Sequence, residues 1–211
     1  MVLAIVLIAV LLIFAFSLII VSYNLYASQN KNLASARNME AANTFSEALK
    51  EEMTEDDPMS GNLWCYIRGN IAYEDTNYTW ADWPYYDPEG SVGHTKEYAY
   101  RYFTLEHNKD IEGFPAVMRL CVYWTLPDGM DGAAFQQRMA NSSSGRSGIV
   151  LHLSTNAETA SQEYQINDCY RLNLGTTSNE GEKLQLDAIA SNYGHSINRE
   201  EKWVWEYIGR E

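Results

Sequence analysis

The chain opens with a run that neither glycine nor proline interrupts, and residues 2–53 read VLAIVLIAVLLIFAFSLIIVSYNLYASQNKNLASARNMEAANTFSEALKEEM. The first twenty of these residues contain a single polar side chain, that of Ser17. At about 1.5 Å of rise per residue, twenty helical residues span roughly 30 Å, the thickness of the hydrocarbon core of a bilayer. We therefore predict a transmembrane helix over residues 1–23.

This helix is expected to stay on the chain as an anchor. A cleaved secretory signal would need a basic segment before its apolar core, and residues 1–4 contain no Lys or Arg. The orientation is less well determined, because Lys31 and Arg37 follow the span and cations favour the cytoplasmic side. The predicted membrane-anchor residues are Val2, Leu7, Leu11, Phe14, Leu18 and Val21.

The helix is expected to continue beyond the apolar run, over residues 24–55, as an amphipathic segment. Apolar residues recur there at steps of three and four, which draws one stripe along a helix. Pro58 and Gly61, in an acidic stretch, end the pattern. The alternative is a hinge near residues 28–30 between two separate helices. The residues predicted to pack on a sheet are Leu33, Met39, Phe45, Leu49 and Met53.

Charge is distributed unevenly along the 211 residues. The chain carries 15 Lys and Arg against 28 Asp and Glu, for a formal net charge of −13, and every one of these residues follows position 30. An acidic chain repels the phosphate backbone that supplies most of the affinity for nucleic acids. Nucleic-acid binding is therefore excluded as the expected function.

Residues 56–211 are predicted to form a globular head of the α+β class. Short helices are expected near residues 62–73 and 95–103. Alternation of apolar and polar residues predicts four strands, at 116–126, 148–154, 162–174 and 202–208. Four consecutive strands favour an antiparallel sheet, and the apolar stripe that ends at Met53 is the obvious cover for one of its faces.

The resulting plan, a long N-terminal helix packed in its second half on an antiparallel sheet, resembles that of type IV pilins and pseudopilins. The resemblance implies a structural subunit, such as a minor pilin or a pseudopilin of a type II secretion-like filament, that acts by helix–helix assembly. It also implies an extracytoplasmic head, with the lipid bilayer, other pilin-like subunits and assembly proteins as partners. Two features differ from the family pattern: its cleavage signature is absent, and Ile5 stands where pilins usually carry Glu.

No enzyme chemistry, cofactor or metal site is predicted from the sequence. His94 and His107 each precede a carboxylate by three residues, Glu97 and Asp110, but the pairs are interpreted as surface polar residues. Three cysteines allow at most one internal disulfide. Cys121 and Cys169 are the candidate pair, because both lie on predicted strands, and the alternative is that the thiols remain unoxidised.

An aromatic segment supplies the candidate partner surface, with Trp80, Trp83, Tyr85 and Tyr86 as its members. Such side chains can stack on sugars or on a protein partner. They would be the contact surface in an alternative function, that of a single-pass, membrane-tethered binding domain that does not polymerise. The simpler interpretation is that they cover one edge of the sheet and fix a long loop.

Overall fold

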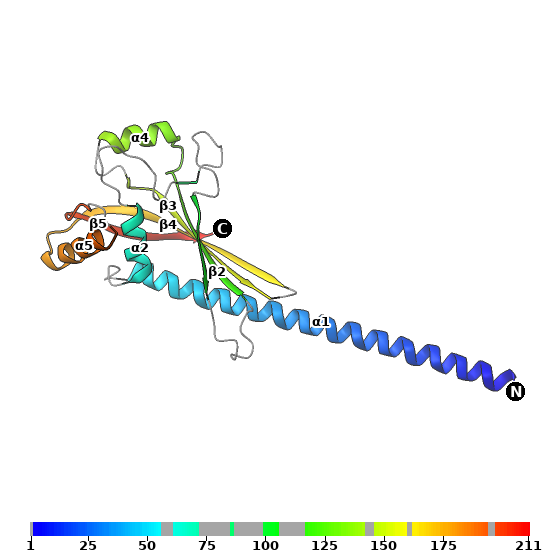
Figure 1. Ribbon diagram of the computed structural model, residues 1–211. Coiled ribbons are helices and arrows are strands. Elements are labelled where there is room, and N and C mark those ends of the chain that lie inside the picture. Colours follow the sequence, from blue (N-terminus) through cyan, green and yellow to red (C-terminus); the bar gives the residue numbers. More distant parts are fainter. Residues whose placement is uncertain are drawn as a thin grey trace.

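The computed structural model describes residues 2–55, 61–71, 85–86, 99–105, 117–141, 146–159, 162–193 and 197–211. Within these ranges, only the backbone is described for residues 2–11, 13, 136 and 138–141. The fold is α+β, as predicted: a long N-terminal helix lies against an antiparallel sheet (Figure 1).

Helix α1 (Val2–Thr54) is one continuous element of 53 residues, as predicted, and the alternative of a hinge near residues 28–30 does not occur. Its C-terminal half lies along the sheet, and its N-terminal half extends away from the head (Figure 1). The absence of Gly and Pro explains the continuity, since these are the residues that most strongly interrupt a helix. The N-terminal half of α1 therefore makes no contact with the described part of the head.

The prediction of a single-pass membrane protein is contradicted. Within the described part of the chain, no helix combines the length and the apolar character that crossing a bilayer requires. Side chains of α1 are described continuously from Phe14, and from there the apolar run ends at Val21. Polar Ser22, Asn24 and Ser28 follow, which lowers the mean hydropathy of any longer window. The transmembrane assignment of residues 1–23 is corrected accordingly.

The sheet has five antiparallel strands, one more than predicted, in the order in which they occur along the chain. Four overlap the predicted strands, although β3 extends four residues beyond the end of the strand predicted at 148–154. The extra one, β1, includes residues 101–103, where a helix was expected. Residues 95–98 of that expected helix lie outside the described part. The strands are β1 (Arg101–Leu105), β2 (Val117–Thr125), β3 (Val150–Glu158), β4 (Glu163–Thr176) and β5 (Glu201–Arg210).

Three further helices belong to the described head. Helix α2 (Asn62–Ile71) was predicted, whereas α4 (Gly132–Asn141) and α5 (Glu180–Tyr193) were not. Helices α2 and α5 contact each other, and α2 also contacts α1. Together with α1 they supply apolar side chains to one core, which includes Met53, Trp64 and Leu186.

The face of the sheet turned to this core, here called the inner face, is the one that the alternating patterns predict. On β2 the buried residues are Met118, Leu120, Val122 and Trp124. On β5, Trp203 and Trp205 are buried, whereas Val204 is 45 % exposed. The period-two pattern therefore identified the inner face of both strands before their pairing was known.

The stripe of α1 that meets the sheet differs from the predicted one. Leu49 and Met53 are buried and Phe45 is partly buried, as expected. Leu33 and Met39, by contrast, are 51 % and 47 % exposed, so their assignment to the sheet contact is wrong. Nearer the middle of α1 the buried residues are small or polar, namely Asn38, Ala42 and Ser46. These small side chains let the helix approach the sheet closely. The polar ones, Asn38 and Ser46, form hydrogen bonds with residues outside α1.

A polar cluster centred on Asp168 of β4 fixes the position of α1 on the sheet. The Ser46 hydroxyl donates a hydrogen bond to the buried Asp168 carboxylate. Tyr207 Oη and Arg210 Nε each donate to Asp168 Oδ1 at 3.0 Å. Arg210 in turn donates to Asn43 Oδ1 at 2.9 Å, so the same guanidinium contacts both helix and sheet. Because these bonds are directional, they set the register in which α1 lies on β4 and β5.

Candidate functional site

The N-terminal half of α1 presents an unusual amount of apolar surface. We call residues 12–26 the projecting segment. Ten large apolar or aromatic side chains in it are between 52 and 70 % exposed. They are Leu12, Phe14, Phe16, Leu18, Ile19, Ile20, Val21, Tyr23, Leu25 and Tyr26. Soluble monomeric proteins rarely leave such a contiguous apolar surface open, and one of this kind marks an interaction site.

The projecting segment is apolar on all sides. Residues 18–21 read Leu, Ile, Ile and Val. Successive residues of a helix are about 100° apart, so these four cover its whole circumference. An amphipathic helix that docks on one partner needs only one apolar stripe, whereas a helix that is apolar all round is normally buried on every side.

The predicted anchor residues divide into two groups. Phe14, Leu18 and Val21 are described and exposed, and all three belong to the projecting segment. The side chains of Val2, Leu7 and Leu11 lie outside the described part of the chain. The structure thus brings the described members together on one helix.

The second notable region is the outer face of the sheet, opposite the inner face. This face carries polar and aromatic side chains and a cavity of about 340 Å³. Tyr100, Tyr102 and Tyr123 are among its lining residues, together with Gln165 and Asn167. This volume is at the lower end of the range found for small-molecule sites.

The predicted aromatic partner surface is not one surface. Tyr85 is fully buried in the core, with its ring 5.3 Å from that of Trp124. Tyr86 lies with the outer-face tyrosines, its ring 5.3 Å from that of Tyr100. Trp80 and Trp83 are outside the described residues. Burial of Tyr85 removes it from any contact surface, which weakens the alternative of a binding domain that uses this segment.

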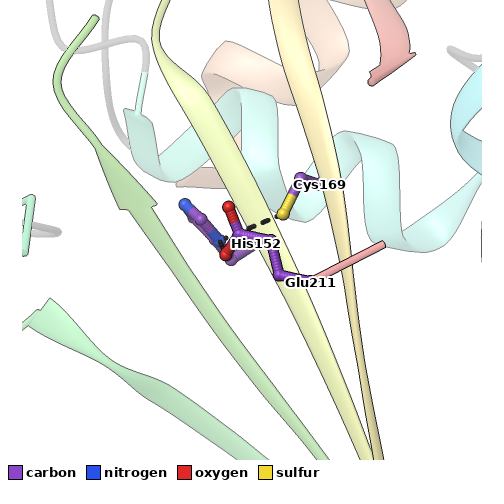
Figure 2. A group of neighbouring side chains, drawn as sticks. All are labelled: His152, Cys169 and Glu211. Carbon is purple, nitrogen blue, oxygen red and sulfur yellow. Dashed lines mark hydrogen bonds and ion pairs between the residues drawn. The ribbon is translucent and has the colours of Figure 1, made fainter. Parts of the chain in front are cut away.

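A side-chain cluster that the sequence did not suggest lies beside the outer-face cavity, formed by His152, Cys169 and Glu211 (Figure 2). His152 on β3 and Cys169 on β4 are direct cross-strand neighbours. Glu211 follows β5, and its backbone N–H donates to Asn167 O of β4 at 2.9 Å. Cys169 Sγ is 3.3 Å from His152 Nδ1, and Glu211 Oε2 is 3.8 Å from the same nitrogen.

The electrostatics of this cluster argue against a nucleophilic cysteine. Burial, followed by the nearby Glu211 carboxylate, raises the pKa of the Cys169 thiol to about 12. Burial lowers the pKa of His152, and Glu211 acts in the opposite direction. Nucleophilic cysteines need the reverse, a thiolate favoured by a neighbouring cation. The pair is therefore a neutral thiol beside a neutral imidazole.

The candidate disulfide between Cys121 and Cys169 is not formed. Cys121 on β2 pairs with Ser154 on β3, and Ser154 pairs with Asn167 on β4. Strand β3 thus separates the two cysteines by two strand spacings, about 9.5 Å, whereas a disulfide requires Cα atoms within about 7 Å. Both thiols lie on the outer face of the sheet, but they are not neighbours.

The candidate histidines from the sequence cannot be placed. His94, Glu97, His107 and Asp110 lie outside the described residues. His152 was missed because it lies between Leu151 and Leu153, in the apolar first part of its strand. Only the register of β3 on β4 reveals its neighbour, and register follows from the assembled sheet.

Comparison with known proteins gives no match to this chain among family models, curated proteins or solved structures. The structure itself defines an α+β protein whose antiparallel sheet carries a helix of 53 residues. Two regions of it can carry function: the projecting segment of α1 and the outer face of the sheet.

Proposed function

We propose that this chain is a pilin-like structural subunit that assembles with further copies of itself through the projecting segment of α1. One observation carries the proposal. A helix held rigidly on the head by its C-terminal half presents ten exposed apolar side chains, on all its sides, in its N-terminal half. The proposed role is that of a minor pilin or pseudopilin, in which such helices pack together as the core of a filament.

The number of neighbours follows from the shape of the apolar surface. A dimer would cover one side of the projecting segment and leave the others in water. Full burial of a Leu, Ile or Phe side chain contributes about 1.5–3 kcal/mol. Ten such side chains supply on the order of 10 kcal/mol or more, from which the cost of association must be subtracted. Several helices around each copy are therefore favoured over a single partner.

The distribution of charge supports the same arrangement. No charged residue occurs before Lys31, so helices can pack along the projecting segment without burying an ion. The acidic residues all follow position 30, so none of them lies in the projecting segment. A head-to-tail contact between copies that does not close into a ring generates an open helical filament.

The full chain should form multi-subunit particles in a manner that depends on concentration and salt. Each chain carries a net charge of −13, so the heads of neighbouring copies repel one another, and salt screens this repulsion. We expect sedimentation velocity to show species larger than a dimer, with a larger assembled fraction at about 0.5 M than at about 0.05 M NaCl. Electron microscopy of the same samples should show elongated particles. A chain that stays monomeric over the whole range of protein and salt concentration would refute the proposal.

A further inference from the structure

We propose that His152, Cys169 and Glu211 form a binding site for one divalent cation of the zinc type, on the outer face of the sheet. The site is distinct from the projecting segment and independent of the proposed assembly. Neighbouring strands bring the three side chains together: β3 and β4 carry the first two, and the residue after β5 is the third (Figure 2).

The spacing of the donor atoms suits tetrahedral coordination. One ligand atom from each residue can be chosen so that all lie within 4.8 Å of one another. Bonds of about 2.0 Å from zinc to nitrogen or oxygen and 2.3 Å to sulfur put tetrahedral ligand atoms about 3.3–3.6 Å apart. The observed separations from His152 Nδ1 are 3.3 Å to Cys169 Sγ and 3.8 Å to Glu211 Oε2. Glu211, whose side chain is 68 % exposed, has to move closer to the other two ligands to complete this geometry.

The histidine is already oriented for this role. Its other ring nitrogen, Nε2, lies 3.2 Å from Thr125 Oγ1. A hydrogen bond from Nε2–H to the threonine hydroxyl leaves the lone pair of Nδ1 free to face the ion, as second-sphere partners of metal-bound histidines do. The ring of Tyr123 stacks on the imidazole at 4.4 Å and 5°, which prevents the ring from turning.

The charges and the donor types select the ion. A thiolate and a carboxylate together neutralise a 2+ charge, and binding transfers the Cys169 thiol proton to solvent. Thiolate and imidazole suit zinc, whereas calcium and magnesium prefer oxygen ligands.

The side-chain amide of Asn167 is placed to complete the coordination. Its Nδ2 atom lies 3.4 Å from His152 Nδ1 and 3.2 Å from Glu211 Oε2. Its Oδ1 atom is buried and has no hydrogen-bond partner among the described residues. A rotation of the amide by 180° exchanges the two atoms and turns this oxygen toward the ion.

The test is metal binding by the full chain. After treatment with a chelator, the protein is dialysed against Zn²⁺ and the bound metal is counted per chain. Co²⁺ is used in parallel to detect a thiolate-to-metal charge-transfer band. We expect one Zn²⁺ per chain, a cobalt band, and no binding of Mg²⁺ or Ca²⁺ at the same concentration. The Cys169→Ser variant should lose the cobalt band and bind Zn²⁺ at least about 100-fold more weakly.

The controls separate loss of a ligand from loss of the fold. Cys121→Ser removes a thiol from the same face that is not part of the cluster, and it should bind Zn²⁺ like the unaltered chain. Glu211→Gln alters a side chain that is 68 % exposed, so it should fold normally and bind about 10-fold or more weakly. Absence of stoichiometric Zn²⁺ from the unaltered chain, or equal binding by the Cys169→Ser and Cys121→Ser variants, would overturn the proposal.

Discussion

The Ile20→Lys variant is expected to remain monomeric at concentrations at which the unaltered chain forms multi-subunit particles. Ile20 lies in the middle of the projecting segment and is 60 % exposed. In the proposed assembly it is surrounded by helices of other copies, so the substitution would place an ammonium group in an apolar environment. Burying an unpaired charge costs several kcal/mol. Sedimentation velocity should show a rise of at least about 100-fold in the concentration needed for assembly.

Leu184→Lys provides the matched control. Leu184 is 65 % exposed on α5, and both substitutions change the net charge by the same +1. This variant should assemble like the unaltered chain, because α5 belongs to the head. Both variants should keep the stability of the unaltered head, since neither side chain is in the core. Equal effects of the two lysines on assembly would contradict the assignment of the projecting segment as the contact.

Replacing Glu201 with Gln should destabilise the head by about 3–5 kcal/mol, a large part of the total stability of a domain of this size. The Glu201 carboxylate is buried between two arginines, with Oε1 3.3 Å from Arg68 Nη1 and 2.8 Å from Arg146 Nη1. The same oxygen accepts a hydrogen bond from Trp203 Nε1 at 2.6 Å. Gln keeps the shape of the side chain but removes the negative charge that both buried guanidinium groups face. Urea denaturation measures the loss.

An exposed ion pair of the same geometry serves as the control. Arg119 Nη1 and Glu158 Oε2 are also 3.3 Å apart, but their side chains are 52 % and 43 % exposed. Surface pairs contribute about 0–1 kcal/mol because water screens them. Glu158→Gln should therefore lower the free energy of unfolding by less than about 1 kcal/mol. Losses of similar size in the two variants would show that the buried network does not organise the head.

The sequence predicts those features of the fold that depend on local pattern. An uninterrupted run of helix-forming residues predicts α1, and alternation predicts four strands and the buried sides of β2 and β5. Helix α5 escaped detection because it begins with Glu180 and Gly181 and has a weak apolar pattern. Leu186 and Ile189 are buried, whereas the equally apolar Leu184 is exposed, so the apolar residues of α5 do not all lie on one side of the helix. Such a helix owes its stability to the core against which it packs.

Buried polar residues are the features that pattern could not predict. The sequence pattern places Asn38 and Ser46 on the polar side of α1, yet both are buried. Their side chains donate hydrogen bonds to Gln162 and Asp168, respectively. A hydrophobic stripe therefore pointed to Leu33 and Met39 instead. The cluster of His152, Cys169 and Glu211 was missed for a related reason, since His152 and Cys169 become neighbours only through strand register. Long-range partners decide which polar residues can be buried, and local periodicity carries no information about them.

The central claim, that the projecting segment forms the core of an assembly of copies, is tested most directly by a nitroxide spin label at position 20. A label at position 184 of α5 serves as the reference, since both native side chains are about equally exposed in the single chain. In assembled particles, the account predicts that the label at 20 is immobile, protected from a soluble relaxing agent and close to labels of several neighbouring copies. The label at 184 should remain mobile and accessible. Equal mobility and equal accessibility at the two positions in the particles would contradict the account.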